Sequence, residues 1–189
     1  MAESKNNIVT FGLSGLVGDL LVFTKRAGKT IVSRKPDKSS VPPTPLQISV
    51  RERFREAVQY AKSILSIPAA KAMYEEMTKP GQSAFNLAMA DVWKAPQIFD
   101  VVVTQYTGLV GSTVTVDTVD RYKVVSVEVS IFTEQDVLIE KGMAVMQENG
   151  RDWVYTATVV NNNPDGCIVR ALAKDRPGNE ANLERLVQL

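Results

Sequence analysis

The chain has 189 residues, of which 44% are hydrophobic and 23% charged, and its formal net charge is +1. This composition is typical of a globular protein with room for one large core or two small ones. The chain has no histidine and one cysteine, which excludes the commonest general base and metal ligand and any intrachain disulfide.

No apolar run approaches the roughly 20 residues that a bilayer span requires. The first fifteen residues contain no basic segment followed by a continuous apolar stretch, so no signal peptide is visible. We therefore expect a protein that is cytoplasmic at synthesis, with an assembled particle or virion as a later location.

Charge is spread unevenly along the chain. Residues 1–40 hold seven basic and three acidic side chains, whereas residues 98–189 hold eight basic and thirteen acidic ones. A basic beginning and an acidic end favour head-to-tail contact between copies of the chain.

Residues 20–25 and 29–35 are predicted to form a β-hairpin, because Ala27-Gly28 supplies the residue types of a tight turn. Four consecutive apolar residues, 20–23, place apolar side chains on both faces of the first strand, and residues 31–32 repeat this in the second. A two-stranded ribbon that is apolar on both faces must pack against other parts of the protein or another subunit, because it is only marginally stable alone in water. The hairpin is therefore the predicted subunit interface, formed by Leu20, Leu21, Val22, Phe23, Lys25, Arg26, Lys29, Ile31, Val32, Arg34 and Lys35.

The segment 37–45, DKSSVPPTP, reads as an extended linker because proline disfavours helix in the residue before it. It can span roughly 25–30 Å in the polyproline conformation. Residues 1–45 are thus predicted to be an N-terminal arm, a hairpin on a linker that can reach a neighbouring subunit.

Residues 46–96 are predicted to be a helical segment of about three helices, 46–66, 69–78 and 84–94. In the first helix Val50, Phe54, Ala57 and Ala61 recur at three- and four-residue steps, a spacing that predicts a stripe facing a core. Pro68 opens the second helix, and Ser83 caps the third.

From residue 97 the pattern changes to short strands separated by turn residues, the arrangement typical of an antiparallel β-sandwich over 97–180. Val125, Val127, Val129 and Ile131 alternate and are predicted to face its core.

Cys167 is predicted to be an inert buried residue. The tail, 181–189, is predicted to form a short helix with Glu180. The predicted strands are 98–104, 113–118, 122–132, 137–146, 153–160 and 168–173.

The run 153–179 contains an aromatic-x-Ala-Thr strand, a glycine turn and an Ala-x-Ala-x-Asp-x-x-Gly-Asn ending. These places are held by Tyr155, Ala157, Thr158, Gly166, Ala171, Ala173, Asp175, Gly178 and Asn179. The pattern resembles the last strands of bacterial immunoglobulin-like and fibronectin-like domains, over roughly the last 90 residues. This resemblance implies a scaffold or an adhesive module.

The first half of the chain has a second resemblance. It rests on the run SAFNLAMADVWKAPQI and on Gly15, Gly18, Val22, Phe23, Lys25, Gly28, Lys29, Arg34 and Pro36. These residues look like an uncharacterised family of small proteins from Bacteroidota and their phages. The resemblance implies a phage-like or filament-like structural role and transfers no functional residue.

Carboxylates are the remaining catalytic candidates: Asp117, Asp120, Asp165, Asp175 and Glu180. A facing pair could hydrolyse a glycoside, but nothing in the spacing brings one pair together. The loops 117–120 and 175–180 could hold calcium, although neither has an alternating oxygen-ligand pattern. We therefore assign no catalytic residue, no cofactor and no metal.

The sequence as a whole predicts an α+β protein with a β-hairpin arm, a short helical segment and an immunoglobulin-like antiparallel sandwich. The predicted function is that of a non-enzymatic structural protein, with other copies of itself as partners and other structural proteins of a particle as further candidates. The alternative is an immunoglobulin-like module that binds glycan or protein through loops such as 161–166. Nucleic acid is not expected as a partner, because the basic residues of the arm lack stacking aromatics.

Overall fold

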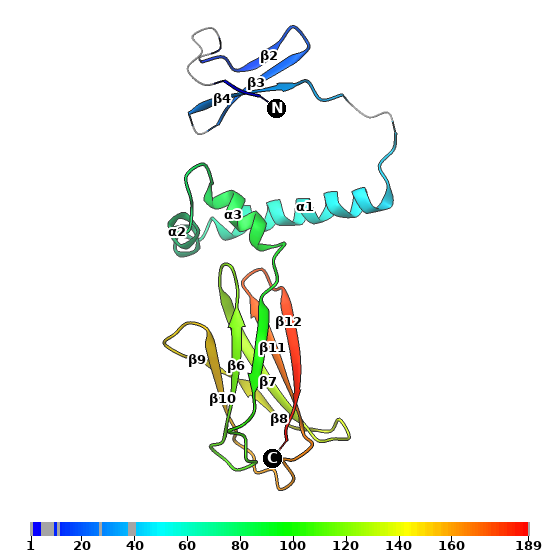
Figure 1. The fold of residues 1–189 in the computed structure, drawn as a ribbon, viewed down its shortest axis with the longest axis vertical. Helices are drawn as coiled ribbons and strands as arrows, with labels where there is room; N and C mark the ends of the chain where they lie inside the picture. Colours follow the sequence, from blue (N-terminus) through cyan, green and yellow to red (C-terminus); the bar gives the residue numbers. More distant parts are fainter. Residues whose placement is uncertain (1, 5–9, 11, 27, 38–40, 189) are drawn as a thin grey trace. The chain divides into compact units, whose positions relative to one another are not determined.

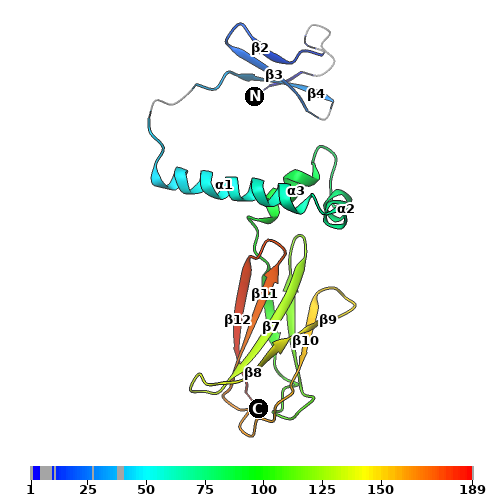
Figure 2. The ribbon, with the colours of Figure 1, turned by 180° about the vertical axis from the view of Figure 1, so that it is seen from behind.

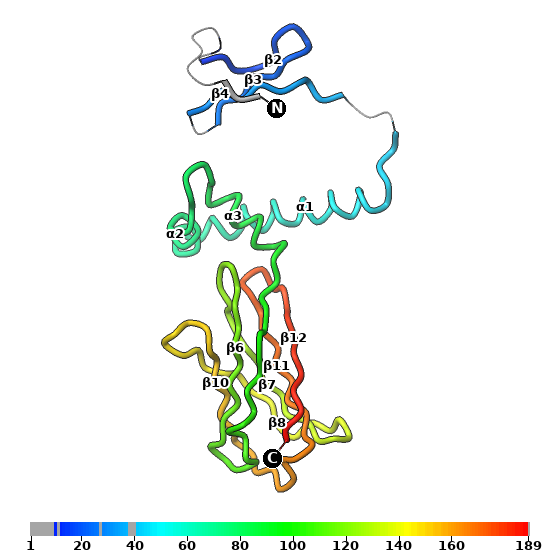
Figure 3. Tube along the Cα trace, viewed as in Figure 1, coloured from blue at the N-terminus to red at the C-terminus, as the bar shows by residue number. Residues whose placement is uncertain are grey.

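The computed structural model describes residues 2–4, 10, 12–26, 28–37 and 41–188, and of residues 2–4 it describes only the backbone. Ala27 of the predicted turn and residues 38–40 of the predicted linker lie outside the described residues. The chain divides into two compact units, Met1–Ala88 and Met89–Leu189, whose course is traced in Figure 3. The fold is α+β, as predicted, and each unit is described by itself.

The first unit begins with a small antiparallel sheet that contains the predicted hairpin. β3 (Leu21–Arg26) and β4 (Lys29–Arg34) pair in register, and Gly28 between them has a φ of 77°. β2 (Gly15–Val17) pairs with β3, and β1 (Ala2–Ser4) pairs with β4, so the order is β1-β4-β3-β2 (Figure 1). The hairpin is confirmed, whereas the two outer strands were not predicted.

Three helices follow, as predicted: α1 (Pro45–Ile64), α2 (Pro68–Glu76) and α3 (Ala84–Asp91). Thr44 caps α1 because its side chain accepts a hydrogen bond from the Gln47 backbone N–H, and the Gln47 side chain accepts one from Thr44 N–H. Ser83 Oγ accepts a hydrogen bond from Asn86 N–H, which confirms the predicted cap of α3.

The apolar stripe of α1 is covered along only part of its length. Ala57 and Ala61 are buried, and Tyr60 shares a hydrogen bond with Tyr74 of α2. Val50 and Phe54 are 49% and 52% exposed, so the prediction that they face a core is wrong. These residues remain exposed because α2 is too short to cover α1: the twenty residues of α1 span about 30 Å, whereas the nine of α2 span about 14 Å. In Figures 1 and 2, α2 lies at the C-terminal end of α1.

Two four-stranded antiparallel sheets pack as a sandwich in the second unit, which confirms the predicted architecture of this region. One sheet has the order β5-β6-β10-β9 and the other β12-β11-β7-β8. The strands are β5 (Gln97–Val102), β6 (Thr113–Val119), β7 (Val124–Phe132), β8 (Leu138–Met143), β9 (Val145–Met146), β10 (Asp152–Thr156), β11 (Ile168–Asp175) and β12 (Glu180–Leu186).

The core of the sandwich lies between the sheets and follows the predicted alternation in β7. Val127, Val129 and Ile131 are fully buried, and Cys167 is buried as predicted. Val125 is 50% exposed, so the prediction that it faces the core is wrong. The pairing of β7 with β11 shifts register at this point, which makes Val125 the extra residue of a bulge and turns Val124 inward.

The C-terminal segment is a strand and not the predicted helix. β12 pairs with β11 along seven residues, from Ile168 opposite Leu186 to Lys174 opposite Glu180. This pairing satisfies the backbone groups of β11 that an edge position would leave open, and Val187 just beyond the strand is fully buried. No described helix of the chain is long and apolar enough to cross a membrane.

Candidate functional site

The hairpin sheet of the arm carries apolar side chains on both faces. Residues directly opposite in an antiparallel sheet share a face, and neighbours along a strand alternate. The register therefore places Val17, Leu21, Phe23 and Val32 on one face and Leu16, Val22 and Ile31 on the other. This is the two-sided apolar ribbon that the sequence predicts.

Few of these side chains are shielded from water. Among residues 12–26 and 28–37, only Phe23 and Thr30 are buried. Leu20 is 66% exposed, Leu21 43%, and Leu16 and Val17 50% each. The exposed apolar surface thus includes two predicted interface residues and two residues of β2 that the sequence analysis missed.

The basic residues of the arm separate into two groups along the hairpin. Lys25, Arg26 and Lys29 lie at its turn, where Arg26 pairs across the ladder with Lys29. Arg34 and Lys35 lie at the other end, and Lys35 Nζ forms an ion pair with Asp19 Oδ1 at 2.9 Å. The turn is therefore the most positively charged part of the described hairpin.

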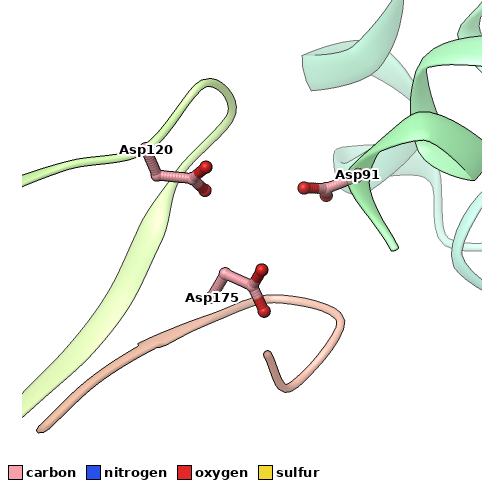
Figure 4. A group of neighbouring side chains, drawn as sticks. All are labelled: Asp91, Asp120 and Asp175. Atoms are coloured by element: carbon pink, nitrogen blue, oxygen red, sulfur yellow. The ribbon is translucent and has the colours of Figure 1, made fainter. Parts of the chain in front are cut away.

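A carboxylate cluster formed by Asp91, Asp120 and Asp175 lies in the second unit. The three side chains come from the end of α3, the turn after β6 and the end of β11, and they point toward one another (Figure 4). One oxygen from each lies within 4.8 Å of the others, and Asp91 and Asp175 are 1% and 4% exposed. Folding therefore brings Asp120 and Asp175 together with a third acid that the sequence did not single out.

The surroundings of Asp175 define its chemistry. Its Oδ1 accepts hydrogen bonds from Gly178 N–H at 2.9 Å and Asn179 N–H at 2.6 Å, and its Oδ2 accepts one from the Asn179 amide. Burial nonetheless raises its pKa above the usual value, and the charge of Asp120 adds to this. Carboxylates at this spacing could ligate a calcium or magnesium ion. Acidic groups also gather without an ion, so the geometry alone assigns no metal.

Glu140 of β8 is a buried acid within the sandwich, with 6% of its surface exposed. Its Oε2 accepts hydrogen bonds from Tyr155 OH at 2.9 Å, Thr158 N–H at 2.9 Å, Thr158 OH at 3.0 Å and Val159 N–H at 3.2 Å. Burial, with the hydrogen bond and charge of Glu140, raises the pKa of Tyr155 to about 12. These contacts join β8, β10 and the segment after β10, which favours a structural role for Glu140.

Two loops of the sandwich line an open cavity of about 300 Å³ that we call the loop hollow. It is lined by Thr133, Glu134, Gln135, Asn161, Asn162, Asn163, Pro164, Asp165 and Cys167. Asn161 of this lining is held in place, because its side-chain amide donates to Tyr106 OH and Cys167 Sγ, and its side-chain oxygen accepts from Asn163 N–H. The hollow is thus lined mainly by polar side chains, one of which, Asn161, is fixed by three hydrogen bonds.

Gly108 lies close against the same loop, 161–164. A Cβ at this position would lie 2.3 Å from the Asn161 carbonyl oxygen, and the φ of Gly108 is 79°. We expect Gly108→Ala to lower the free energy of unfolding by about 3 kcal/mol or more, through both strain and collision. The control is Gly111→Ala, since Gly111 also has a positive φ but a Cβ there meets nothing within 4 Å. Urea unfolding compares the two, and equal losses would contradict the close approach.

The comparisons with known proteins leave the family open. No family model matches the chain, and no curated protein matches it. One solved structure, described as an engineered protein, is 14% identical with a TM-score of 0.33, a likeness too weak to carry an argument. It covers 59% of this chain, and the chain spans 31% of that protein. The two resemblances drawn from the sequence therefore remain predictions.

The structure thus contains three candidate sites: the arm, the loop hollow and the carboxylate cluster. They differ in how well they could be predicted from the sequence. The arm was predicted from consecutive apolar residues, and the hollow contains the loop 161–166 that the alternative function would use. Asp91 gave no signal, because it stands in an apolar helical run and meets Asp120 and Asp175 only through the fold.

Proposed function

We propose that this protein is a non-enzymatic structural protein that assembles with copies of itself through its N-terminal arm. The observation that carries the proposal is the hairpin sheet, whose two faces hold apolar side chains while only Phe23 and Thr30 of its described side chains are buried. A small sheet whose described apolar side chains remain mostly exposed gains little free energy from burial. Contact with another subunit supplies the missing cover.

The edges of the sheet add a second reason. β2 is an edge strand of three residues, so one side of its backbone has no partner strand among the described residues. Edge strands of this kind pair readily with a strand of another chain. Leu16 and Val17, half exposed on this edge, would be buried by such pairing.

The first half of α1 presents further apolar surface in the same unit. Leu46 is 74% exposed, Val50 49% and Phe54 52%, and their four-residue spacing places them along one face of the helix. Large apolar patches on a protein surface commonly mark sites of protein association. This patch supports assembly, although the proposal rests on the arm.

Hydrogen exchange tests the proposal directly. If copies pair through the arm, backbone amides of residues 15–26 should exchange about tenfold more slowly once the protein concentration is about ten times the dissociation constant. Amides of β7 in the sandwich core serve as the control and should not change. Exchange in residues 15–26 that is independent of protein concentration would contradict arm-mediated assembly.

A binding module for glycan or protein ligands is the second candidate, and the loop hollow is the observation that favours it. Its rim carries the amide side chains of Gln135 and Asn162, groups that both donate and accept hydrogen bonds. In this case the arm would belong to a monomer. Slow exchange of the arm at every concentration, in a protein of monomeric mass, would then be expected.

A further inference from the structure

The turn between β9 and β10 contains a chemically labile pair of residues. Asn149 precedes Gly150, and no other asparagine of the chain is followed by glycine. Because glycine has no Cβ, its backbone nitrogen is unshielded and the backbone around it is the least restrained. Attack of that nitrogen on the preceding side-chain amide closes a five-membered ring. Asn149 is therefore the asparagine of this chain at which the ring forms most readily.

The fold uses the same pair of residues to make the turn. Gly150 has a φ of 68°, a conformation that favours glycine, and its N–H donates to the Gln147 carbonyl oxygen at 3.0 Å. Asn149 Oδ1 accepts from the backbone N–H groups of Arg151 at 3.0 Å and Asp152 at 2.9 Å. Gln147, Asn149, Gly150 and Arg151 are exposed, so a local opening exchanges these hydrogen bonds for bonds to water. The Gly150 nitrogen is thus released whenever the turn opens.

The side-chain amide of Asn149 also supports a row of carboxylates across the sheet. Asp152 of β10 lies opposite Asp117 of β6, and Asp117 lies opposite Asp100 of β5. Like charges directly opposite one another destabilise a sheet. Asp100 and Asp117 each accept a hydrogen bond from an arginine, whereas Asp152 Oδ2 accepts one from Asn149 Nδ2 at 2.7 Å. Conversion of the amide to a carboxylate would replace this donor by a further negative charge.

We propose that Asn149 is a site of spontaneous deamidation and that its products loosen the turn between β9 and β10. The deprotonated backbone nitrogen of Gly150 attacks the side-chain amide carbon of Asn149, and a carbon–nitrogen bond forms. The bond to the amide nitrogen breaks, and ammonia leaves with the proton that the Gly150 nitrogen lost. Water then opens the cyclic imide at either carbonyl, which leaves aspartate or isoaspartate at position 149.

Both products weaken the turn. Either one places a carboxylate where the amide donated to Asp152, and two like charges at this distance repel each other. Isoaspartate also adds one carbon to the main chain, so the hydrogen bonds from the backbone of residues 151 and 152 lose their geometry. β9 is an edge strand of two residues that pairs with β10. Its attachment to the sheet therefore depends on this turn.

Incubation of the folded full-length chain tests the site. Peptide mapping by mass spectrometry should show a gain of about 1 Da at Asn149, faster than at any other asparagine. The rate should rise by up to about tenfold per pH unit, because the deprotonated nitrogen is the nucleophile. Asn149→Gln is the control, since its longer side chain closes a less favourable ring and should convert more slowly. If Asn149 stays intact while an unfolded peptide of residues 145–156 converts, the fold protects the site and the proposal is wrong.

Hydrogen exchange on the modified chain, separated by ion-exchange chromatography, tests the consequence. Amides of residues 147 and 150–152 should exchange at least about tenfold faster than in the unmodified chain, and amides of β7 should not change. Asn149→Asp adds the charge without lengthening the main chain and should give a smaller increase. Equal exchange in the modified and unmodified chains would overturn the loosening of the turn. Neither readout depends on self-association, so failure here leaves the proposed function unaffected.

Discussion

Replacing both Leu20 and Leu21 by lysine is expected to dissociate the assembly into monomers at concentrations where the parent remains associated. The two side chains are 66% and 43% exposed in the single chain, so burial of the exposed part in a neighbour would contribute about 1–2 kcal/mol for Leu20 and about 1 kcal/mol for Leu21, and a buried lysine charge would add a further cost. The dissociation constant should rise roughly a hundredfold or more. Sedimentation velocity over a range of protein concentrations measures the change.

The matched control for this prediction lies on the sandwich. Val145 and Met146 of β9 are 67% and 45% exposed, so Val145→Lys with Met146→Lys makes a similar change on a surface outside the arm. This variant should associate like the parent. Equal effects of the two variants would show that added charge, and not the arm, controls association.

Glu140→Ala is expected to lower the free energy of unfolding by about 2–4 kcal/mol. The substitution removes the acceptor of four hydrogen bonds and leaves the buried Tyr155 hydroxyl without one. Glu140→Gln should cost less, because its amide oxygen can still accept. The control is Glu128→Ala on β7, which loses only a 3.5 Å ion pair with the exposed Lys141 and should cost below about 1 kcal/mol.

The same contact predicts how stability depends on alkaline pH. Tyr155 has a pKa of about 12 in the folded chain against 10.0 for an ordinary tyrosine, so between these values the unfolded chain loses a proton that the folded chain keeps. Stability should therefore fall as pH rises from about 10 to 12, by about 3 kcal/mol in total. Tyr155→Phe should remove this part of the pH dependence. Identical profiles in urea unfolding of parent and variant would contradict the assignment.

Elements whose own residues decide their conformation were predictable. The hairpin needed only Gly28 between two apolar runs, and α1 begins where Thr44 and Pro45 supply a cap and a first turn. The alternation over Val127, Val129 and Ile131 likewise specified a half-buried strand. In each case the signal lies within a few neighbouring residues.

Features that depend on distant pairing were not predictable. The tail, from Glu180, has helical spacing of its apolar residues, but pairing with β11 overrides that preference. Val125 faces outward because of a register shift against Asp175, and Phe54 remains exposed because α2 is short. The meeting of Asp91, Asp120 and Asp175 likewise requires knowledge of how three segments converge.

The mass of the unmodified chain in solution tests the central claim most directly. Sedimentation equilibrium from about 1 to 100 µM should give a mass that rises with concentration to a multiple of the 20.8 kDa chain. A single species of 20.8 kDa over the whole range would contradict assembly through the arm.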